Sequence, residues 1–154
     1  MAETAPDRTK VFISYSHEDA KFLQRFQVHL KPLEREGLER WDDTRISTGQ
    51  RWKEEIEKAL ASAKVAVLLI SADFLASDFI DTEELPHLLA AEEKEGLIVM
   101  PVILSPCRFS RTLSLSQFQA VNSPDKPLTS LSTSEQDAVW DKLSKDIEAV
   151  LHPQ

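Results

Sequence analysis

Apolar residues along this chain form two alternating patterns, short continuous runs and longer stretches with helical spacing. Between and after the runs, apolar residues recur at steps of three and four, as in Phe22, Phe26, Leu30 and Leu33, which predicts helices with one buried face. Strands that alternate with helices favour a parallel sheet covered on both sides. We therefore expect an α/β, flavodoxin-like three-layer sandwich with a five-stranded parallel sheet of order 2-1-3-4-5. The runs that predict its strands are residues 11–15, 38–41, 65–70, 97–104 and 118–121.

The third and fourth runs carry further information about the sheet. Residues 65–70 contain no polar position, which fits a parallel strand that is buried on both faces. Pro101 interrupts the run at 97–104, and because proline donates no backbone hydrogen bond, it predicts a strand near the sheet edge or one that stops early. Gly96 suits the left-handed end of the preceding helix.

The helix predicted over residues 77–95 begins with an acidic stretch. Carboxylates are favoured in a first helical turn by the helix dipole and by unpaired N–H groups, so most of them need no functional explanation. Glu83 differs, because at α-helical spacing it shares a face with Phe79 and Ile80, beside apolar side chains that should point inward. It is therefore the candidate functional residue of this segment.

The expected topology predicts where a ligand would bind. Open parallel sheets bind ligands at the carboxyl ends of their strands, where the strand order reverses, which here lies between strands one and three. Residues 14–17 leave strand one, residues 71–74 leave strand three, and Asp42 and Asp43 end strand two. Glu83 is expected where these loops meet, and a carboxylate in a cleft is a stronger site candidate than one on open surface.

The composition is that of one globular domain. The chain has 154 residues and a mass of 17.4 kDa, with 42% hydrophobic and 29% charged residues. We expect a flexible N-terminus at residues 1–9 and a single domain at 10–154. A net charge of −8 argues against nucleic acid and anionic membranes as partners.

The sequence also favours a cytoplasmic location. Cys107 is the only cysteine, which excludes an internal disulfide and fits a reducing compartment. No apolar run is long enough to span a bilayer, and the first ten residues lack the apolar core of a signal peptide.

Several common chemistries lack the residues they need. The sequence has no Gly-x-Gly-x-x-Gly fingerprint, phosphate-binding loop or His-Glu-x-x-His motif. Glu83 and His87 form at most half of a metal site, so we expect no metal. A phospho-accepting receiver domain has the same strand order, but strand three here ends in Ile70 and Ser71, without an aspartate to accept the phosphoryl group.

Four segments in this order resemble the Toll/interleukin-1 receptor (TIR) domain family: VFISYSHED, the WDD loop with Gly49 behind it, VAVLLIS, and FLASDFIDTEEL. The resemblance covers residues 10–151 and is closer to the prokaryotic, NAD-cleaving members than to animal receptor adaptors. It implies the flavodoxin-like fold. It also implies cleavage of the bond between nicotinamide and ribose in NAD+, although other members only assemble signalling complexes.

The resemblance implies roles for particular residues. Enzymatic members have a glutamate four residues after a tryptophan, which matches Glu83 and Phe79 here and favours Glu83 over Glu84 as the catalytic residue. Phenylalanine in place of tryptophan keeps a surface for ring stacking. The remaining matches imply four further substrate-binding residues, Ser14, Tyr15, Ser16 and Asp42, beside Phe79.

The expected activity is that of an NAD+ nucleosidase. NAD+ would be its substrate, with no cofactor, and the products would be nicotinamide with ADP-ribose or a cyclic isomer. The resemblance further implies activation by TIR–TIR self-association into a filament or higher oligomer, a possible tethered sensor domain, and a part in antiphage signalling. Two alternatives stay open: a non-enzymatic TIR–TIR scaffold that docks through the loop at residues 42–50, and a nucleoside glycosidase of related fold.

Overall fold

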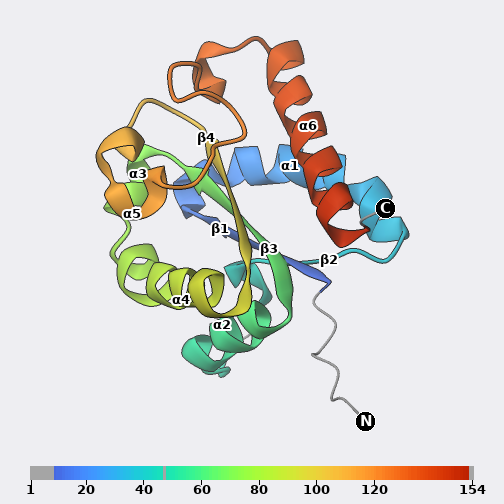
Figure 1. The fold of residues 1–154 in the computed structure, drawn as a ribbon, viewed down its shortest axis with the longest axis vertical. Coiled ribbons are helices and arrows are strands. Elements are labelled where there is room, and N and C mark those ends of the chain that lie inside the picture. The colour runs from blue at the N-terminus through green and yellow to red at the C-terminus, as the bar shows by residue number, and fades with distance from the viewer. Residues whose placement is uncertain (1–8, 47, 153–154) are drawn as a thin grey trace.

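The computed structural model describes residues 9–46 and 48–152, and the four strands that it contains form one parallel sheet of order β2-β1-β3-β4 (Figure 1). The predicted strand order is confirmed for these four strands. Most of the predicted flexible N-terminus, residues 1–8, lies outside the described residues, as do Ser47 and residues 153–154. The strands are β1 Lys10–Tyr15, β2 Glu39–Trp41, β3 Ala63–Ile70 and β4 Ile98–Ile103.

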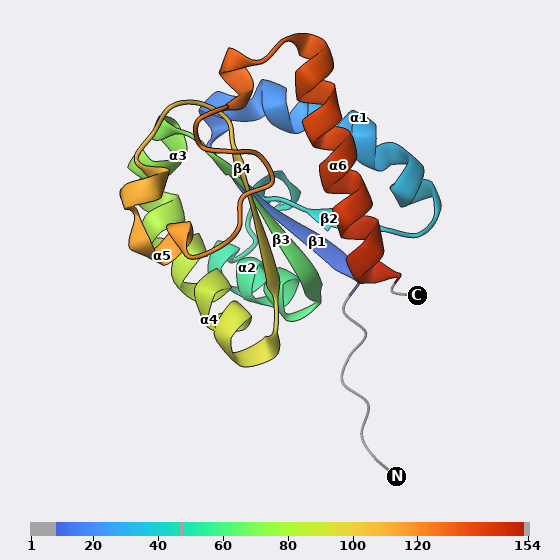
Figure 2. The same cartoon turned by 45° about the horizontal axis from the view of Figure 1, so that its top comes forward.

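Helices cover both faces of the sheet, as predicted. On one face, α1 (Ala20–Arg35) packs beside α6 (Thr133–Leu151) (Figure 1). Figure 2 shows the other face, where α2, α4 and the short helices α3 and α5 gather. Their bounds are α2 Trp52–Ala61, α3 Ala72–Ala76, α4 Leu85–Glu95 and α5 Leu113–Ser116, and short 3-10 turns lie at His17–Asp19, Asp43–Arg45, Phe109–Arg111 and Leu128–Ser130.

Strand β3 divides the hydrophobic core into two halves. Residues Val65–Ile70 are all fully buried, and successive side chains point to opposite faces of the sheet. Leu68 packs in the half that contains Leu88 of α4, whereas Leu69 packs in the half that contains Trp140 of α6. This explains why the run has no polar position, and it places the carboxyl end of β3 between two layers of helices.

The predicted fifth strand at residues 118–121 is wrong, because this segment is irregular beside the edge strand β4. The backbone N–H of Val121 donates to the carbonyl of Pro101 at 2.8 Å. Beyond that bond, the side-chain amide of Asn122 accepts from the Ile103 N–H and donates to the Ile103 carbonyl, both at 2.9 Å. A side chain thus replaces the strand, and the position of Pro101 at the sheet edge, where its missing N–H is tolerated, is confirmed.

We expect Asn122→Ala to lower the free energy of unfolding by about 2–4 kcal/mol, because it leaves buried groups of Ile103 without partners. Asn122 also donates to the Lys126 carbonyl at 3.0 Å, so the substitution would release the following turn. Urea unfolding measures the change, with the exposed Gln119→Ala as the control. Equal stabilities of the two variants would show that Val121 alone holds the segment against β4.

The helix predicted over residues 77–95 is confirmed, because the chain is helical without a break from Asp78 to Glu95. Within this helix, Asp78 and Phe79 lead into a π-helical turn at Ile80–Glu84, which continues directly into α4, and the separate short helix α3 lies before it. In the π turn the Leu85 N–H donates to the carbonyl of Ile80, five residues back. Gly96 ends α4 in the left-handed conformation with φ of 75°, as predicted. The extra residue in the π turn changes which side chain faces inward.

Candidate functional site

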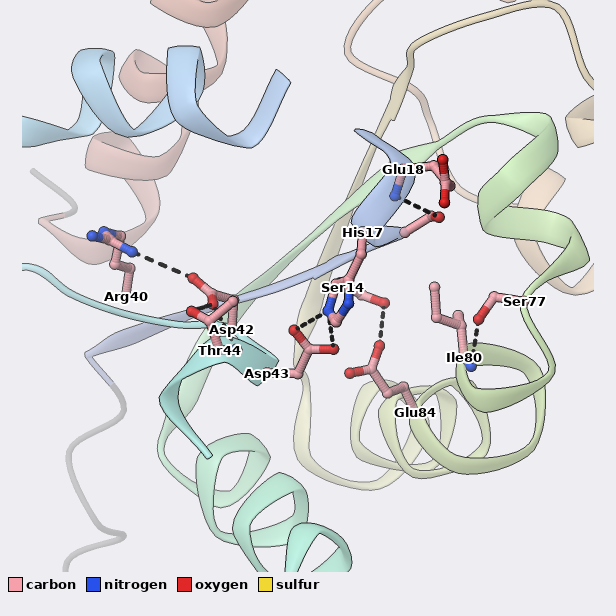
Figure 3. A network of polar contacts seen from close by, with 11 residues as sticks. Ser14, His17, Glu18, Arg40, Asp42, Asp43, Thr44, Ser77, Ile80 and Glu84 are labelled. Atoms are coloured by element: carbon pink, nitrogen blue, oxygen red, sulfur yellow. Dashed lines mark hydrogen bonds and ion pairs between the residues drawn. The ribbon is translucent and has the colours of Figure 1, made fainter. Parts of the chain in front are cut away.

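The candidate site lies at the carboxyl end of β1, where the turn after β2 and the π turn meet (Figure 3). Ser14 is the fifth residue of β1 and is fully buried. Asp43 opens the 3-10 turn after β2, and Glu84 closes the π turn. The structure therefore brings together the loops that the topology predicted.

Glu84 is the carboxylate at this meeting point. Only 1% of the residue is exposed, and the Ser14 hydroxyl donates a hydrogen bond to its Oε1 at 2.7 Å. The pKa of Glu84 is raised to about 7, mainly by burial and also by the negative charges of Asp43 and Asp42, while the bond from Ser14 and the charge of His17 oppose the rise. The side chain therefore changes charge near neutral pH.

The prediction that Glu83 lies at this meeting point is wrong in position. Glu83 is half-buried, and the hydrogen bond that it accepts comes from the hydroxyl of its neighbour Thr82, at 3.4 Å. The reason is the π turn, which adds one residue between Phe79 and the inward-facing carboxylate, so that the spacing is five instead of four. The catalytic role of Glu83 stays a prediction, but its location does not favour it.

A signal for Glu84 is present in the sequence. Ile80, Glu84, Leu88 and Ala91 follow one another at steps of four, four and three, and all four are buried. Glu84 is thus the one charged position in an apolar stripe that continues through α4. Counting backward from α4, instead of forward from Phe79, selects it.

A cleft of about 280 Å³ lies at this meeting point, and although Glu84 does not line it, the Glu84 charge acts on two residues that do, Tyr15 and His17. Three of the predicted substrate-binding residues, Tyr15, Ser16 and Phe79, line it, whereas Ser14 does not line it and is bonded to Glu84. Phe79 also packs edge-on against Trp52, with ring centroids 5.5 Å apart. The full lining is Tyr15, Ser16, His17, Glu18, Asp43, Ser77, Phe79 and Ile80.

Asp42, the remaining predicted substrate-binding residue, makes contacts within its own loop. It is fully buried, accepts from the backbone N–H of Thr44 at 3.0 Å and from the Thr44 hydroxyl, and forms an ion pair with Arg40 at 3.3 Å. Asp42 therefore caps the turn that begins at Asp43. The next residue, Asp43, lines the cleft in its place.

His17 and Asp43 lie together in the cleft, and neither is among the site residues predicted from the sequence. The Nε2 atom of His17 is 3.0 Å from both carboxylate oxygens of Asp43, and this bond raises the pKa of His17 above its ordinary value. Burial, together with the charges of Asp43, Asp42 and Glu84, raises the pKa of Tyr15 to about 12, so its hydroxyl stays protonated.

The side chains around the cleft suit an organic ligand. Within residues 9–46 and 48–152, no group of three or more His, Cys, Asp and Glu side chains is placed to hold a metal ion. In the same residues, no helix is long and apolar enough to cross a bilayer. Flat rings in the cleft can contact a planar base, and a buried carboxylate beside it can accept bonds from hydroxyls or oppose a positive charge.

Comparison with known proteins identifies the family. The TIR domain family matches residues 11–143, so the chain belongs to it. The y4lF protein of Sinorhizobium fredii is 32% identical over 120 residues, which cover 77% of this chain and 37% of that protein. The NAD(+) hydrolase TcpA of a Theionarchaea archaeon is 30% identical over 93 residues, 60% of this chain and 27% of that protein.

A solved structure has the same fold. The TIR domain of the Toll-related receptor TRR-2 from Hydra magnipapillata matches with a TM-score of 0.60 at 21% identity, over 90% of this chain and 97% of that one. At this identity the match supports the fold. The chain spans well under half the length of the two curated relatives, 37% and 27%.

Proposed function

We propose that this TIR domain cleaves the bond between nicotinamide and ribose in NAD+, with Glu84 as the catalytic carboxylate. The observation that carries the proposal is the buried Glu84, bonded to Ser14 beside a cleft with aromatic walls. The resemblance to a protein named as an NAD(+) hydrolase adds support. In this proposal Glu84, instead of the predicted Glu83, is the catalytic residue.

The chemistry needs little more than a well-placed negative charge. When the bond from the ribose carbon C1′ to the ring nitrogen breaks, the electron pair leaves with nicotinamide, which becomes neutral and needs no acid. The sugar becomes an oxocarbenium-like cation. An ionised Glu84 opposes this developing charge and accepts hydrogen bonds from the ribose hydroxyls, much as it now accepts one from Ser14. Phe79 and Tyr15 would contact the rings, and Ser16 would position the sugar.

The burial of Glu84 gives a reason why the reaction would depend on self-association. With 1% of the residue exposed, the carboxyl group must exchange its bond with Ser14 for bonds to the sugar before it can act. We propose that TIR–TIR association between copies of the domain brings about this exchange, as the family resemblance implies, and that the reaction serves immune signalling. A single, dissociated chain would then be a poor enzyme.

The test is an NAD+ assay over a wide range of protein concentration, with and without a crowding agent. Nicotinamide and ADP-ribose are separated by chromatography and identified by mass. We expect nicotinamide release that rises more steeply than in proportion to protein concentration. Absence of release under every condition would favour the scaffold alternative, and release of bases from nucleosides instead would favour the glycosidase.

A further inference from the structure

His17 and Asp43 form an oriented pair at the cleft, brought together from two separate turns (Figure 3). An ionised carboxylate can only accept hydrogen bonds, so the Nε2 atom that contacts Asp43 carries the hydrogen. In the neutral ring the other nitrogen, Nδ1, then has the lone pair and can accept a proton. Asp43 thus sets both the tautomer and the orientation of a potential base.

The surroundings of His17 suit proton transfer from water. About 70% of its side chain is exposed, so water reaches it, whereas Asp43 is held at 15% exposure. The groups that act on the ring are Asp43 and Asp42 from the turn after β2, Glu84 from the π turn, and Tyr15 of β1, whose ring centroid is 5.4 Å away. The three carboxylates all favour the protonated ring, which strengthens it as a base.

We propose that His17 is the base that accepts a proton from the water that attacks the ribosyl cation, with Asp43 as its positioning residue. The inference rests on the proposed function. Departure of nicotinamide leaves a cation at C1′. The water oxygen forms the new bond to C1′, its proton passes to Nδ1 of His17, and the resulting imidazolium is paired with Asp43. The product of this step is linear ADP-ribose.

The proposal separates two kinds of nucleophile. Water must lose a proton when it attacks, and so depends on a base. A pyridine such as 3-acetylpyridine attacks through a nitrogen lone pair and has no proton to lose. Removal of His17 should therefore slow hydrolysis while leaving exchange of nicotinamide for the added pyridine comparatively unaffected.

The experiment supplies NAD+ and 3-acetylpyridine together and measures the ratio of ADP-ribose to the exchanged dinucleotide. We expect His17→Gln to lower this ratio by about tenfold or more. His152→Ala, an exposed histidine at the end of α6, serves as the control and should leave it unchanged. His17→Gln should fold normally, because the ion pair with Asp43 that it removes is exposed and such pairs contribute little to stability. Urea unfolding checks this.

The role of Asp43 has its own readout. In the wild type the ratio should fall at low pH, as His17 becomes protonated, and Asp43→Asn should move this fall to lower pH because the carboxylate no longer raises the pKa of the ring. An unchanged ratio in His17→Gln, or a wild type that forms only a cyclic product, overturns this inference alone. Absence of nicotinamide release from the wild type overturns the proposed function as well.

Discussion

Glu84→Gln is expected to reduce the rate of NAD+ cleavage by about 10²–10³-fold, whereas Glu83→Gln leaves it nearly unchanged. The amide has almost the same shape as the carboxylate, and its oxygen can still accept the bond from Ser14. It carries no negative charge, so it cannot oppose the cation that forms on the ribose. The measurement is the initial rate of nicotinamide release at one protein concentration, chosen where the wild type is active.

The two substitutions form a matched pair, since they make the same chemical change at adjacent positions. Comparison of sedimentation profiles ensures that both variants associate as the wild type does. If Glu83→Gln is inactive and Glu84→Gln active, the sequence-based assignment to Glu83 is correct and the proposal for Glu84 is wrong. Equal loss in both would indicate a general effect of charge at the π turn.

Glu84→Gln is also expected to make the folded protein more stable at alkaline pH. The pKa of Glu84 rises on folding from 4.5 to about 7, so the folded state favours the protonated form. The stability that protonation contributes is fully present below pH 4.5 and is lost as the pH rises through 7. The variant, which is neutral throughout, escapes this loss. Its advantage in free energy of unfolding should therefore grow by about 3 kcal/mol between pH 4 and pH 8.

Urea unfolding at a series of pH values measures this difference, with Glu83→Gln as the control that should run parallel to the wild type. A constant difference between Glu84→Gln and the wild type at every pH would mean that the carboxyl group titrates normally in the folded protein. Together with the activity measurement, the expected result would show a buried acid that costs stability at the pH where it is ionised for catalysis.

Features that depend on local pattern were predictable from the sequence. The all-apolar run in β3 predicts a strand buried on both faces, and Pro101 predicts the sheet edge, because each follows from side chains that are close in the chain. Gly96 predicts the end of α4 for the same reason. The loops that meet at the site follow from strand order alone.

Two predictions, the fifth strand and the position of Glu83, were wrong for the same reason. In each case a backbone group forms a hydrogen bond outside the regular strand or α-helix pattern. The edge of β4 is completed by the side chain of Asn122 instead of a fifth strand, which strand propensity does not reveal. The segment before α4 bonds Leu85 to Ile80 across five residues, so counting at α-helical spacing selects Glu83. A one-residue insertion into a helix turns every side chain beyond it.

The sequence by itself determined the order of strands and helices, the family, and the three loops that surround the site, because these follow from hydrophobic periodicity and short motifs. Only the tertiary structure decided that Glu84 faces Ser14, that Asp42 caps its own turn, and that Asp43 pairs with His17. Such choices between neighbouring residues depend on the exact rotation of a helical turn and on partners distant in the chain. Local sequence spacing carries neither.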